Sequence, residues 1–226
     1  MKLPFKINLE NKVCVVTGAG GVICSHLARA LAQCGAKVAL LDLNKDSAEV
    51  FAKEIREEGG IAYAYEANVL KKDSLEACHR EILKDLGKCD ILINGAGGNN
   101  PRATTDNEYA KLDDEVKGIK TFFDLDEAGV EFVFNLNFIG TLLPTQVFAC
   151  DMVGRQDCSI MNISSMNAFT PLTKIPAYSG AKAAISNFTK WLAVHFSHVG
   201  IRCNAIAPGF FVTKQNEKLL YNEDGT

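Results

Sequence analysis

Residues 12–24 read KVCVVTGAGGVIC, and residues 37–42 read KVALLD. The first run begins as a short apolar strand, passes through the glycine-rich turn Gly18-Ala19-Gly20-Gly21 and enters a helical period over residues 22–34. The second run is another apolar strand. A helix between two strands returns the chain to the same edge of a sheet, so the two strands pair in parallel. This stretch predicts a β-α-β unit and, with it, an α/β fold.

The same alternation of strands and helices continues along the rest of the chain. Further strands are predicted at 61–66, 90–94, 159–164 and 201–207, and further helices at 44–58, 71–86, 127–153 and 178–198. The strands are apolar on both faces, as a parallel sheet covered by helices requires. Asn44 or Asp46 could cap the helix at 44–58, and Gly59-Gly60 would end it. We expect a doubly wound parallel sheet with its ligand site at the carboxyl ends of the strands.

The 226 residues contain no internal repeat and no low-complexity linker, so we expect residues 1–226 to form a single domain. One segment breaks the alternation. Residues 98–126 (GNNPRATTDNEYAKLDDEVKGIKTFFDLD) are polar, acidic and rich in turn formers. Long loops in compact domains are often lids or binding loops, whereas a solvated surface insertion is the alternative. Both interpretations of this insertion stay open.

Charge and composition exclude several classes of function. The net charge is −3 without a long basic run, which argues against nucleic acid and anionic membranes as partners. No apolar stretch reaches membrane-spanning length, and the N-terminal MKLPFKINLENK is too polar for a secretion signal, so we expect a cytoplasmic protein. The eight cysteines lack C-x-x-C spacing and fit reduced core cysteines. His195 and His198 lack the other ligands of a zinc site, so no metal is expected.

The glycine turn and Asp42 together predict a dinucleotide site. Glycines after a strand let the backbone approach a pyrophosphate at a helix N-terminus, where free N–H groups favour anions. By itself such a turn fits any tight connection. Asp42 follows the glycine turn by about twenty residues, where a carboxylate binds the adenosine ribose hydroxyls. It would repel a 2′-phosphate and no arginine neighbours it, so we expect NAD rather than NADP.

Two more turns follow predicted strands. Asn68-Val69 is placed to flank an adenine after the third strand. Asn94-Gly95-Ala96-Gly97 follows the fourth strand and would leave room for a cofactor, although a simple turn explains these residues equally well.

Ser165 ends the fifth predicted strand, and Tyr178 and Lys182 lie near the start of the next helix. A spacing of four residues puts Tyr178 and Lys182 on one helix face. A free tyrosine has a pKa near 10, and a nearby ammonium or an oxidised nicotinamide favours the tyrosinate. Lowering the pKa by about three units corresponds to about 4 kcal/mol. An ordinary helix could carry this pair, but beside Ser165 and the dinucleotide motifs it predicts an acid/base site.

With these motifs the chain resembles the classical short-chain dehydrogenase/reductase family from Val13 to about Thr213. Asn137 in Leu136-Asn137-Phe138 and the run Pro208-Gly209-Phe210-Phe211-Val212-Thr213 also match the family pattern. The resemblance implies a Rossmann-type fold and hydride transfer between an alcohol and NAD. It implies that Tyr178 is the general acid/base and that Ser165 orients the substrate oxygen. It implies that Lys182 lowers the tyrosine pKa and holds the nicotinamide ribose, and that Asn137 anchors a water of a proton relay.

The motifs and the resemblance together define the expected cofactor contacts. They are Gly18, Gly20, Gly21, Val22, Ile23, Asp42, Leu43, Asn68, Val69, Asn94, Gly95, Ala96, Gly97, Tyr178, Lys182, Pro208, Gly209, Phe211 and Thr213.

The chain departs from the family pattern in a few places. Val22 and Cys24 replace later glycines of the family turn Thr-Gly-x-x-x-Gly-x-Gly, and Gly20 and Gly21 could supply the flexibility instead. Asn68 stands where aspartate is common, and Gly95 where asparagine is common. Family members normally continue past the position of Thr226 with a substrate loop, a seventh strand and an oligomerisation segment, so we expect that family segment to be absent from the chain.

A narrower resemblance concerns the substrate. The runs NGAGGNNP at 94–101, FNLNFIGTLLPTQ at 134–146 and SMNAF at 165–169 resemble a subgroup of D-mannonate oxidoreductases, also called fructuronate reductases. The implied reaction converts D-mannonate and NAD reversibly to D-fructuronate and NADH. Candidate substrate residues are Asn99, Asn100, Arg102, Asn167 and Lys174. Arg102 or Lys174 could meet a carboxylate, and each of the five could equally be an exposed loop residue.

Three functional hypotheses remain. The first is an NAD-dependent sugar-acid dehydrogenase, the second an NAD-binding module without catalysis, and the third a dehydrogenase of another polyol, a ketogluconate or a hydrophobic alcohol. The complete set of Asn137, Ser165, Tyr178 and Lys182 favours catalysis. The apolar helices near 130–150 and 184–196 fit core or a subunit interface, and the resemblance implies a homodimer or homotetramer.

Overall fold

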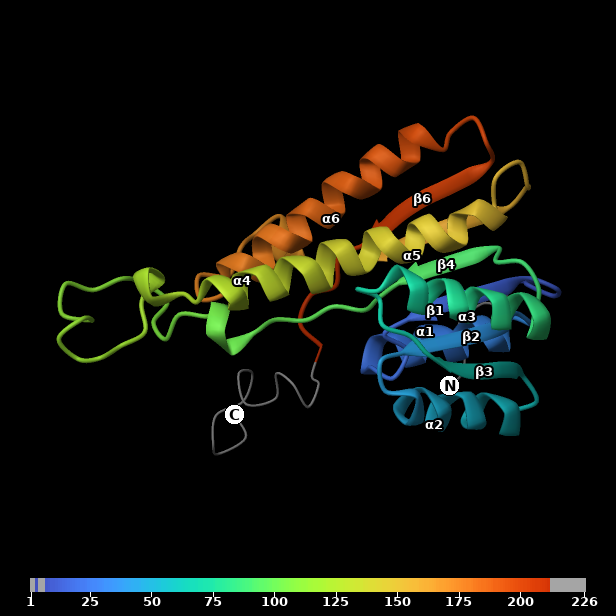
Figure 1. Cartoon of the computed structure of the whole chain (residues 1–226), viewed down its shortest axis with the longest axis horizontal. Helices are drawn as coiled ribbons and strands as arrows, with labels where there is room; N and C mark the ends of the chain where they lie inside the picture. Colours follow the sequence, from blue (N-terminus) through green and yellow to red (C-terminus); the bar gives the residue numbers. More distant parts are fainter. Residues whose placement is uncertain (1–2, 4–6, 212–226) are drawn as a thin grey trace.

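The computed structural model describes residue 3 and residues 7–211, which form a parallel sheet of six strands between two layers of helices (Figure 1). The strand order is β3-β2-β1-β4-β5-β6. The chain therefore winds outward from β1 in one direction and then from β4 in the other, which confirms the doubly wound α/β fold. The strands are β1 Val13–Thr17, β2 Lys37–Asp42, β3 Ile61–Glu66, β4 Ile91–Asn94, β5 Cys158–Ile163 and β6 Ile201–Ile206.

The helices cover the sheet in two groups, each with its own apolar core. The α-helices are α1 Val22–Gln33, α2 Lys45–Glu57, α3 Lys72–Asp85, α4 Glu127–Phe134, α5 Gly140–Phe148 and α6 Pro176–His195. Small residues of α1 and α2, such as Ala28 and Ala52, pack on one face of the sheet. Larger side chains of α3, α5 and α6, such as Ile82, Phe148 and Leu192, pack on the other face. As expected, Asn44 caps α2 by accepting a bond from Ser47 N (3.3 Å).

The two outer strands differ from the sequence-based expectation. Both faces of all strands were expected to be covered, but β3 alternates and leaves Ile61 47% and Tyr63 45% exposed. In β6, Arg202 and Asn204 are exposed while Ile201 and Cys203 are buried. The reason is position, because both strands form edges of the described sheet and helices cover one of their faces more fully than the other.

The expected helix at 127–153 is a composite. A π turn, η3 Asn135–Ile139, separates α4 from α5, and a 3₁₀ turn, η4 Ala149–Asp151, ends the run. By length and composition alone, Glu127–Asp151 could cross a membrane, so the expectation that no apolar stretch is long enough is corrected here. Half of its most apolar window is buried inside the protein, as in the core helix of a folded domain.

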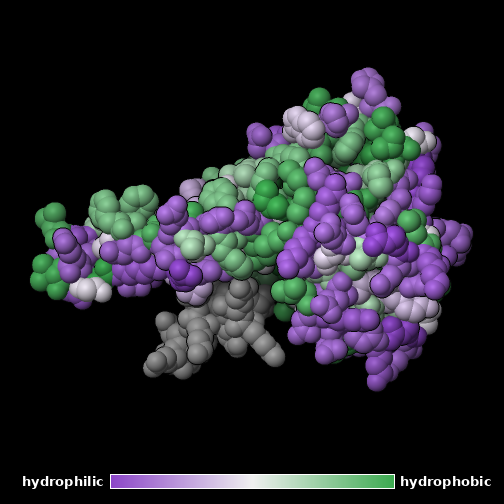
Figure 2. Space-filling view, viewed as in Figure 1, coloured by the Kyte–Doolittle hydropathy of each residue, from purple (hydrophilic) through white to green (hydrophobic). Residues whose placement is uncertain are grey.

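The segment between β4 and α4 forms a projecting arm, which we define as residues 104–126 (Figure 1, left). Lys120 fixes its base, because its Nζ donates to the carbonyls of Pro101 (2.8 Å) and Arg102 (2.9 Å). The buried Asp114 organises the tip by accepting bonds from Asn107 Nδ2 (2.8 Å) and Lys111 N (2.9 Å). Figure 2 shows apolar residues at its end, and the exposed apolar side chains of the arm are Tyr109, Leu112, Val116, Phe122 and Phe123.

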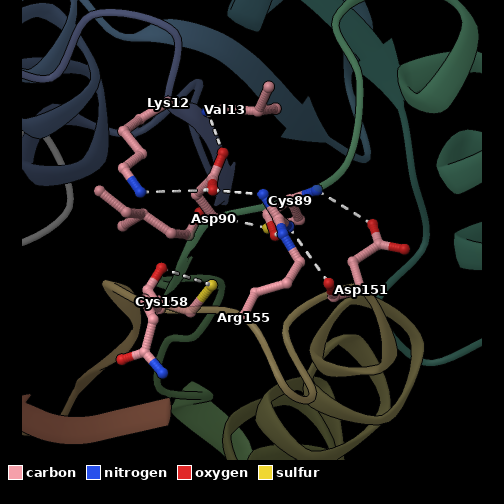
Figure 3. A network of polar contacts seen from close by, with 9 residues as sticks. Lys12, Val13, Cys89, Asp90, Asp151, Arg155 and Cys158 are labelled. Carbon is pink, nitrogen blue, oxygen red and sulfur yellow. Dashed lines mark hydrogen bonds and ion pairs between the residues drawn. The ribbon is translucent and has the colours of Figure 1, made fainter. Parts of the chain in front are cut away.

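A polar network joins β1 and β4 at the edge where these strands begin (Figure 3). The buried Asp90 accepts bonds from Val13 N (2.9 Å) and Arg155 Nη2 (2.6 Å), and Lys12 Nζ lies 3.7 Å away. Arg155 also donates to the carbonyl of Cys89 (2.9 Å). Because parallel strands begin at this edge and end at the other, the network lies opposite the expected ligand site.

Candidate active site

The turn after β1 is built for close approach of a ligand. Gly18 has φ +66°, and a methyl group there would lie 2.8 Å from Cα of Ala96. Only glycine satisfies both conditions without strain. Gly21 begins α1 without a side-chain cap, and the first turn of α1 holds no acidic residue. The first N–H groups of α1 therefore lack a side-chain acceptor, as a pyrophosphate site requires.

Asp42 is held in place at the end of β2. Its Oδ2 accepts a bond from Gly20 N (2.9 Å), and its Oδ1 accepts one from Asn44 N (3.0 Å). A side chain at position 20 would meet Asp42 Oδ2 at 3.0 Å, so Gly20 leaves the carboxylate its place. The expected ribose-binding carboxylate thus lies directly beside the glycine turn. Leu43, which follows it, is exposed.

The turn after β4 packs against the turn after β1. Thr17 Oγ1 accepts bonds from Gly95 N (3.1 Å) and Ala96 N (3.2 Å). A methyl group at Gly95 would fall on Cys24 Sγ, so Cys24 fills the space that a side chain at position 95 would need. This contact joins two residues that sequence analysis had treated as separate departures from the family pattern.

The remaining expected contacts of the adenosine part lie after β3. Asn68 uses its Oδ1 locally by accepting a bond from Leu70 N (2.9 Å). Val69 is buried, and a methyl group at Gly140 would lie 3.0 Å from its Cγ2. Val22 and Ile23 open α1, with Val22 exposed. These placements are compatible with an adenine between the ends of β2 and β3, which stays a prediction.

Ser165, Tyr178 and Lys182 come together as their spacing predicted. Ser165 follows β5, and its side chain lies beside that of Tyr178. Lys182 lies one turn further along α6, with its Nζ 5.5 Å from the centre of the Tyr178 ring. The lysine is buried and donates to the carbonyl of Ile163 at the end of β5 (2.8 Å). A hydroxyl, a phenol and an amine thus form one cluster at the carboxyl end of the sheet.

The electrostatics of this cluster differ from the expectation. Burial raises the pKa of Tyr178, and the hydrogen bond from Ser165 opposes this rise. Burial also lowers the pKa of Lys182 to about 8, with a smaller opposing effect from Cys24. The protein alone does not produce the lowered tyrosine pKa that the Tyr–Lys spacing suggested, because the loss of water on burial outweighs the interaction with Ser165.

Asn137 lies in the π turn and links it to the turn after β4. Its Nδ2 donates to the carbonyls of Gly98 (2.8 Å) and Val133 (2.7 Å), and its Oδ1 accepts from Gly98 N (3.3 Å). A methyl group at Gly97 would meet Asn137 Oδ1 at 2.6 Å and Lys182 Nζ at 3.2 Å. Asn137 and Lys182 therefore face the same glycine. The water that the resemblance assigns to Asn137 stays a prediction.

The loop after β6 borders the serine. Met166 N donates to the carbonyl of Pro208 (3.0 Å), which places this loop beside the residue that follows Ser165. Gly209 and Phe211 are exposed there. Thr213, the last expected cofactor contact, lies outside the described residues.

The five candidate substrate residues fall into different surroundings. Asn100 accepts a bond from Arg102 N (2.9 Å), and Arg102 pairs with Asp126 (2.8 Å) at the exposed base of the arm. Arg102 thus already has a carboxylate partner. Lys174 is half-buried and forms no ion pair with any described residue. Asn167 is buried and Asn99 is half-buried.

Metal-ligating side chains gather at a place that sequence analysis did not single out. Within the part of the chain that the structure describes, His79, Cys150 and Asp151 could offer ligand atoms within 4.8 Å of one another. Asp151 Oδ2 already accepts bonds from Cys89 N (3.0 Å) and contacts His79 Nε2 (2.9 Å), which accounts for its burial. All eight cysteines are free thiols, and all but Cys150 are buried.

Together these features fit NAD. Glycines leave a cradle at the ends of β1 and β4, no side-chain cap is present at the start of α1 among the described residues, and a fixed carboxylate lies beside the glycine turn. A hydroxyl, a phenol and an amine lie beside the cradle. The class that this fold and site define is a dinucleotide-dependent oxidoreductase.

Comparison with known proteins agrees. The family model described as short chain dehydrogenase matches residues 12–224. A protein of Haemophilus influenzae called an uncharacterized oxidoreductase is 63% identical over 225 residues, which is 100% of this chain and 79% of that protein. The chain belongs to the short-chain dehydrogenase family and is an oxidoreductase.

Two solved structures are similar at different levels. The crystal structure of a protein from Haemophilus influenza, provisionally named a D-mannonate oxidoreductase and holding NAD, has a TM-score of 0.93 and 64% identity over 97% of this chain and 78% of that one. A gluconate 5-dehydrogenase from Burkholderia cenocepacia, in complex with NADP and tartrate, has a TM-score of 0.80 and 28% identity over 96% of this chain and 78% of that one. The first similarity supports binding of NAD(H) by this chain.

Proposed function

We propose that this protein interconverts D-mannonate and D-fructuronate with NAD. The observation that carries the chemistry is the association of Ser165 and Tyr178 beside the buried Lys182, next to a glycine cradle. Support for the substrate comes from the provisional name of the similar Haemophilus protein.

In this mechanism the protein residues handle the proton. NAD, when bound, accepts hydride from the alcohol carbon or returns it as NADH. Tyr178 removes the proton of the substrate hydroxyl during oxidation and returns it during reduction. Ser165 donates the single proton of its hydroxyl to the substrate oxygen, while its Oγ accepts from Asn167 N (3.2 Å). Lys182 stabilises the tyrosinate, and Asn137 holds the adjoining turn in position.

The preference for NAD over NADP is part of the proposal. Two backbone N–H groups fix the Asp42 carboxylate beside the glycine turn, where it would accept bonds from ribose hydroxyls and repel a 2′-phosphate. Against this stands the NADP in the related gluconate 5-dehydrogenase structure, which makes direct comparison of the two cofactors necessary.

We propose Lys174 as the group that binds the substrate carboxylate. It is a half-buried cation without an ion-pair partner among the described residues, and it lies a few residues before Tyr178. Arg102, the other candidate, would have to leave Asp126 first.

A panel of substrates tests the proposal. Purified protein is assayed with NAD and with NADP on D-mannonate, D-gluconate and simple polyols, and with NADH on D-fructuronate. We expect the highest kcat/KM with D-mannonate and NAD. Highest activity on another polyhydroxy acid would support the alternative that the gluconate 5-dehydrogenase similarity favours. No turnover of any alcohol, together with tight NADH binding, would overturn the enzymatic proposal in favour of a binding module.

We also propose that the protein forms a homodimer or homotetramer and works in the cytoplasm. The support for an oligomer is the exposure of large apolar side chains on two helices, Phe132 and Phe134 on α4 and Trp191 and Val194 on α6. Light scattering on the purified protein measures the subunit number, and a monomer at micromolar concentration would contradict this part.

A further inference from the structure

Two amide oxygens close to the catalytic cluster are buried without a hydrogen-bond partner in the described part of the chain: Asn99 Oδ1 and Asn167 Oδ1. Leaving a buried acceptor unpaired costs about 1–3 kcal/mol, so such atoms call for an explanation. The other two unpaired atoms, Asn94 Oδ1 and Ser179 Oγ, lie within β4 and α6. Asn99 and Asn167 instead lie just after strand ends, where the ligand site is.

The orientation of the Asn99 amide is determined by its neighbour. Thr104 Oγ1 donates its single proton to the carbonyl of Asn100 (3.0 Å). It can therefore only accept from Asn99, whose Nδ2 lies 3.0 Å away. The nitrogen of Asn99 must face Thr104, and the atom left without a partner is an oxygen. Asn99 follows Gly97 by two residues, and Gly97 faces both Asn137 and Lys182.

Asn167 lies in the turn that follows Ser165. It follows Ser165 by two residues, its backbone N–H donates to Ser165 Oγ (3.2 Å), and its side chain is 6% exposed. Since the side chain of Ser165 also lies beside that of Tyr178, the backbone of Asn167 is joined to the catalytic pair. Its unpaired Oδ1 belongs to a residue two positions from the catalytic serine.

The chemistry of the two oxygens selects the ligand. Amide oxygens accept hydrogen bonds and offer none, so they cannot pair with a carboxylate or a ketone oxygen. Hydroxyl groups can satisfy them. We infer that Asn99 and Asn167 are specificity-determining residues that accept hydrogen bonds from substrate hydroxyls other than the one that is oxidised. This inference rests on the proposed function and deepens it, because it restricts the substrates to polyhydroxylated compounds.

A simple secondary alcohol would leave both oxygens buried and unpaired in the complex. Sites built to pair with a substrate hydroxyl reject analogues that lack it far more strongly than apolar pockets reject a missing methylene. The two asparagines therefore discriminate against apolar alcohols, whereas Ser165 and Tyr178 act on any alcohol that reaches them.

The test uses Asn99→Leu and Asn167→Leu, which keep the side-chain size and remove the acceptor. The substrates are D-mannonate and D-gluconate, and 3-hydroxybutyrate serves as an acid with a single hydroxyl. We expect kcat/KM for the polyhydroxy acids to fall by about 10- to 100-fold per variant, as loss of a buried hydrogen bond predicts. The value for 3-hydroxybutyrate, where measurable, should stay within a factor of about two or rise.

Stability and binding separate this role from a structural one. Asn167→Leu removes an unpaired buried acceptor, so the melting temperature of the apoprotein should not fall. Asn99→Leu also removes the bond from Asn99 Nδ2 to Thr104 and should cost no more than that one hydrogen bond, about 1 kcal/mol of unfolding free energy. Affinity for NADH, measured by fluorescence titration, should be unchanged. A fall in melting temperature with equal losses on all substrates would overturn the inference in favour of a structural role, and unchanged kcat/KM for the polyhydroxy acids would also overturn it. Asn99→Ala and Asn167→Ala replace any leucine variant that does not fold.

The outcome stays distinguishable from failure of the proposed function. If the unchanged protein does not oxidise D-mannonate, the substrate proposal fails. Calorimetric titration of the NADH complex with D-gluconate and D-mannitol then still tests the asparagines. Weaker polyol binding by the leucine variants supports their role, and equal binding by all variants contradicts it.

Discussion

At the residue scale, the pair Cys24 and Gly95 explains two departures from the family pattern as one adjustment. Cys24 stands where a glycine is usual, and its Sγ occupies the place of a side chain at position 95. Burial raises the pKa of the Cys24 thiol to about 12, so it stays a neutral packing group. The larger residue in α1 thus requires the smaller one after β4.

This pairing predicts a coupled effect of two substitutions. Gly95→Ala alone forces the new methyl group onto Cys24 and should cost roughly 1–3 kcal/mol of unfolding free energy. In a Cys24→Gly background the same change should cost less than about 1 kcal/mol, because the space is then free. Urea unfolding of the four proteins measures the coupling. Strictly additive costs would show that the two residues do not depend on each other.

The buried Lys182 predicts a particular dependence of stability on pH. Its pKa is about 8 in the folded protein against 10.5 for the free side chain, so below pH 8 the fold carries the full penalty of a buried ammonium. Between pH 8 and 10.5 the unfolded chain binds more protons, and stability rises with pH. The penalty removed is at most about 3 kcal/mol.

Lys182→Met removes this contribution. We measure the unfolding free energies of the unchanged protein and of the variant by urea unfolding without NAD. We expect the value for the unchanged protein minus the value for the variant to increase as the pH rises from 7.5 to 10. Comparing the two proteins cancels the cysteines, which ionise in the same range. A difference independent of pH would mean that Lys182 is not buried as an amine.

Much of the candidate site could be predicted at this scale, and one property could not. The spacing of Tyr178 and Lys182 follows from helix geometry, and Ser165 from its position after a strand, so the sequence predicted their association. In the protein without NAD, burial raises the pKa of Tyr178, an effect that the spacing of Tyr178 and Lys182 does not reveal. The unpaired oxygens of Asn99 and Asn167 also depend on surroundings that no pattern encodes.

At the scale of elements, the run from α4 to α5 positions Asn137 through an irregularity. In a π turn the backbone hydrogen bonds join residues that are five apart in the sequence instead of four. The extra residue shifts the side chains that follow, and such turns commonly mark functional sites. Here the π turn Asn135–Ile139 lets the Asn137 amide reach the turn after β4. Hydrophobic periodicity predicted one continuous helix, because a single extra residue in a turn hardly changes an apolar pattern.

The arm is an element with its own internal order. Lys120 joins it to Pro101 and Arg102, whereas the rest of the domain has its separate core. Lys120→Met should therefore accelerate amide hydrogen exchange within residues 101–126 by about tenfold, as loss of roughly 1 kcal/mol predicts.

The global unfolding free energy should stay within about 0.5 kcal/mol in this variant, which denaturant unfolding measures. Lys117→Met is the matched control, because Lys117 pairs only with Asp113 at the surface of the same arm and should change neither quantity. A large loss of global stability in Lys120→Met would show that the arm is part of the domain core.

For the whole molecule, the two ends of the parallel strands have different roles. The carboxyl ends of the strands carry the glycine cradle and the catalytic cluster, and the amino ends carry the Asp90 network of Figure 3. Stability and chemistry should therefore respond to different substitutions.

Asp90→Asn tests this division. The change leaves Arg155 and Lys12 without their carboxylate partner, and we expect a loss of about 2–3 kcal/mol, less than for a fully buried pair because Arg155 is partly exposed. The affinity for NADH should not change. Asp113→Asn, in an exposed pair, should cost below about 0.5 kcal/mol. Weaker NADH binding by Asp90→Asn would contradict the separation of stability at the amino ends of the strands from cofactor binding at their carboxyl ends.

The architecture as a whole was largely predictable from alternation. Short apolar runs separated by helical periods predicted all six strands within about two residues, and the doubly wound sheet followed from them. Strand order could not be derived from local patterns, so the exposure of β3 and β6 as edges was missed. The position of the insertion at residues 98–126 relative to the site was also left open, because its polar sequence predicts turns but not the direction in which they project.

The central claim, proton transfer by Tyr178 next to bound NAD, is tested most directly by Tyr178→Phe. The variant keeps the ring that packs beside Lys182 and loses only the hydroxyl that lies beside Ser165. Turnover of the best substrate of the panel should fall by about 10²- to 10⁴-fold, while NADH affinity measured by fluorescence titration stays within a factor of about two. Turnover within tenfold of the unchanged protein would contradict the account.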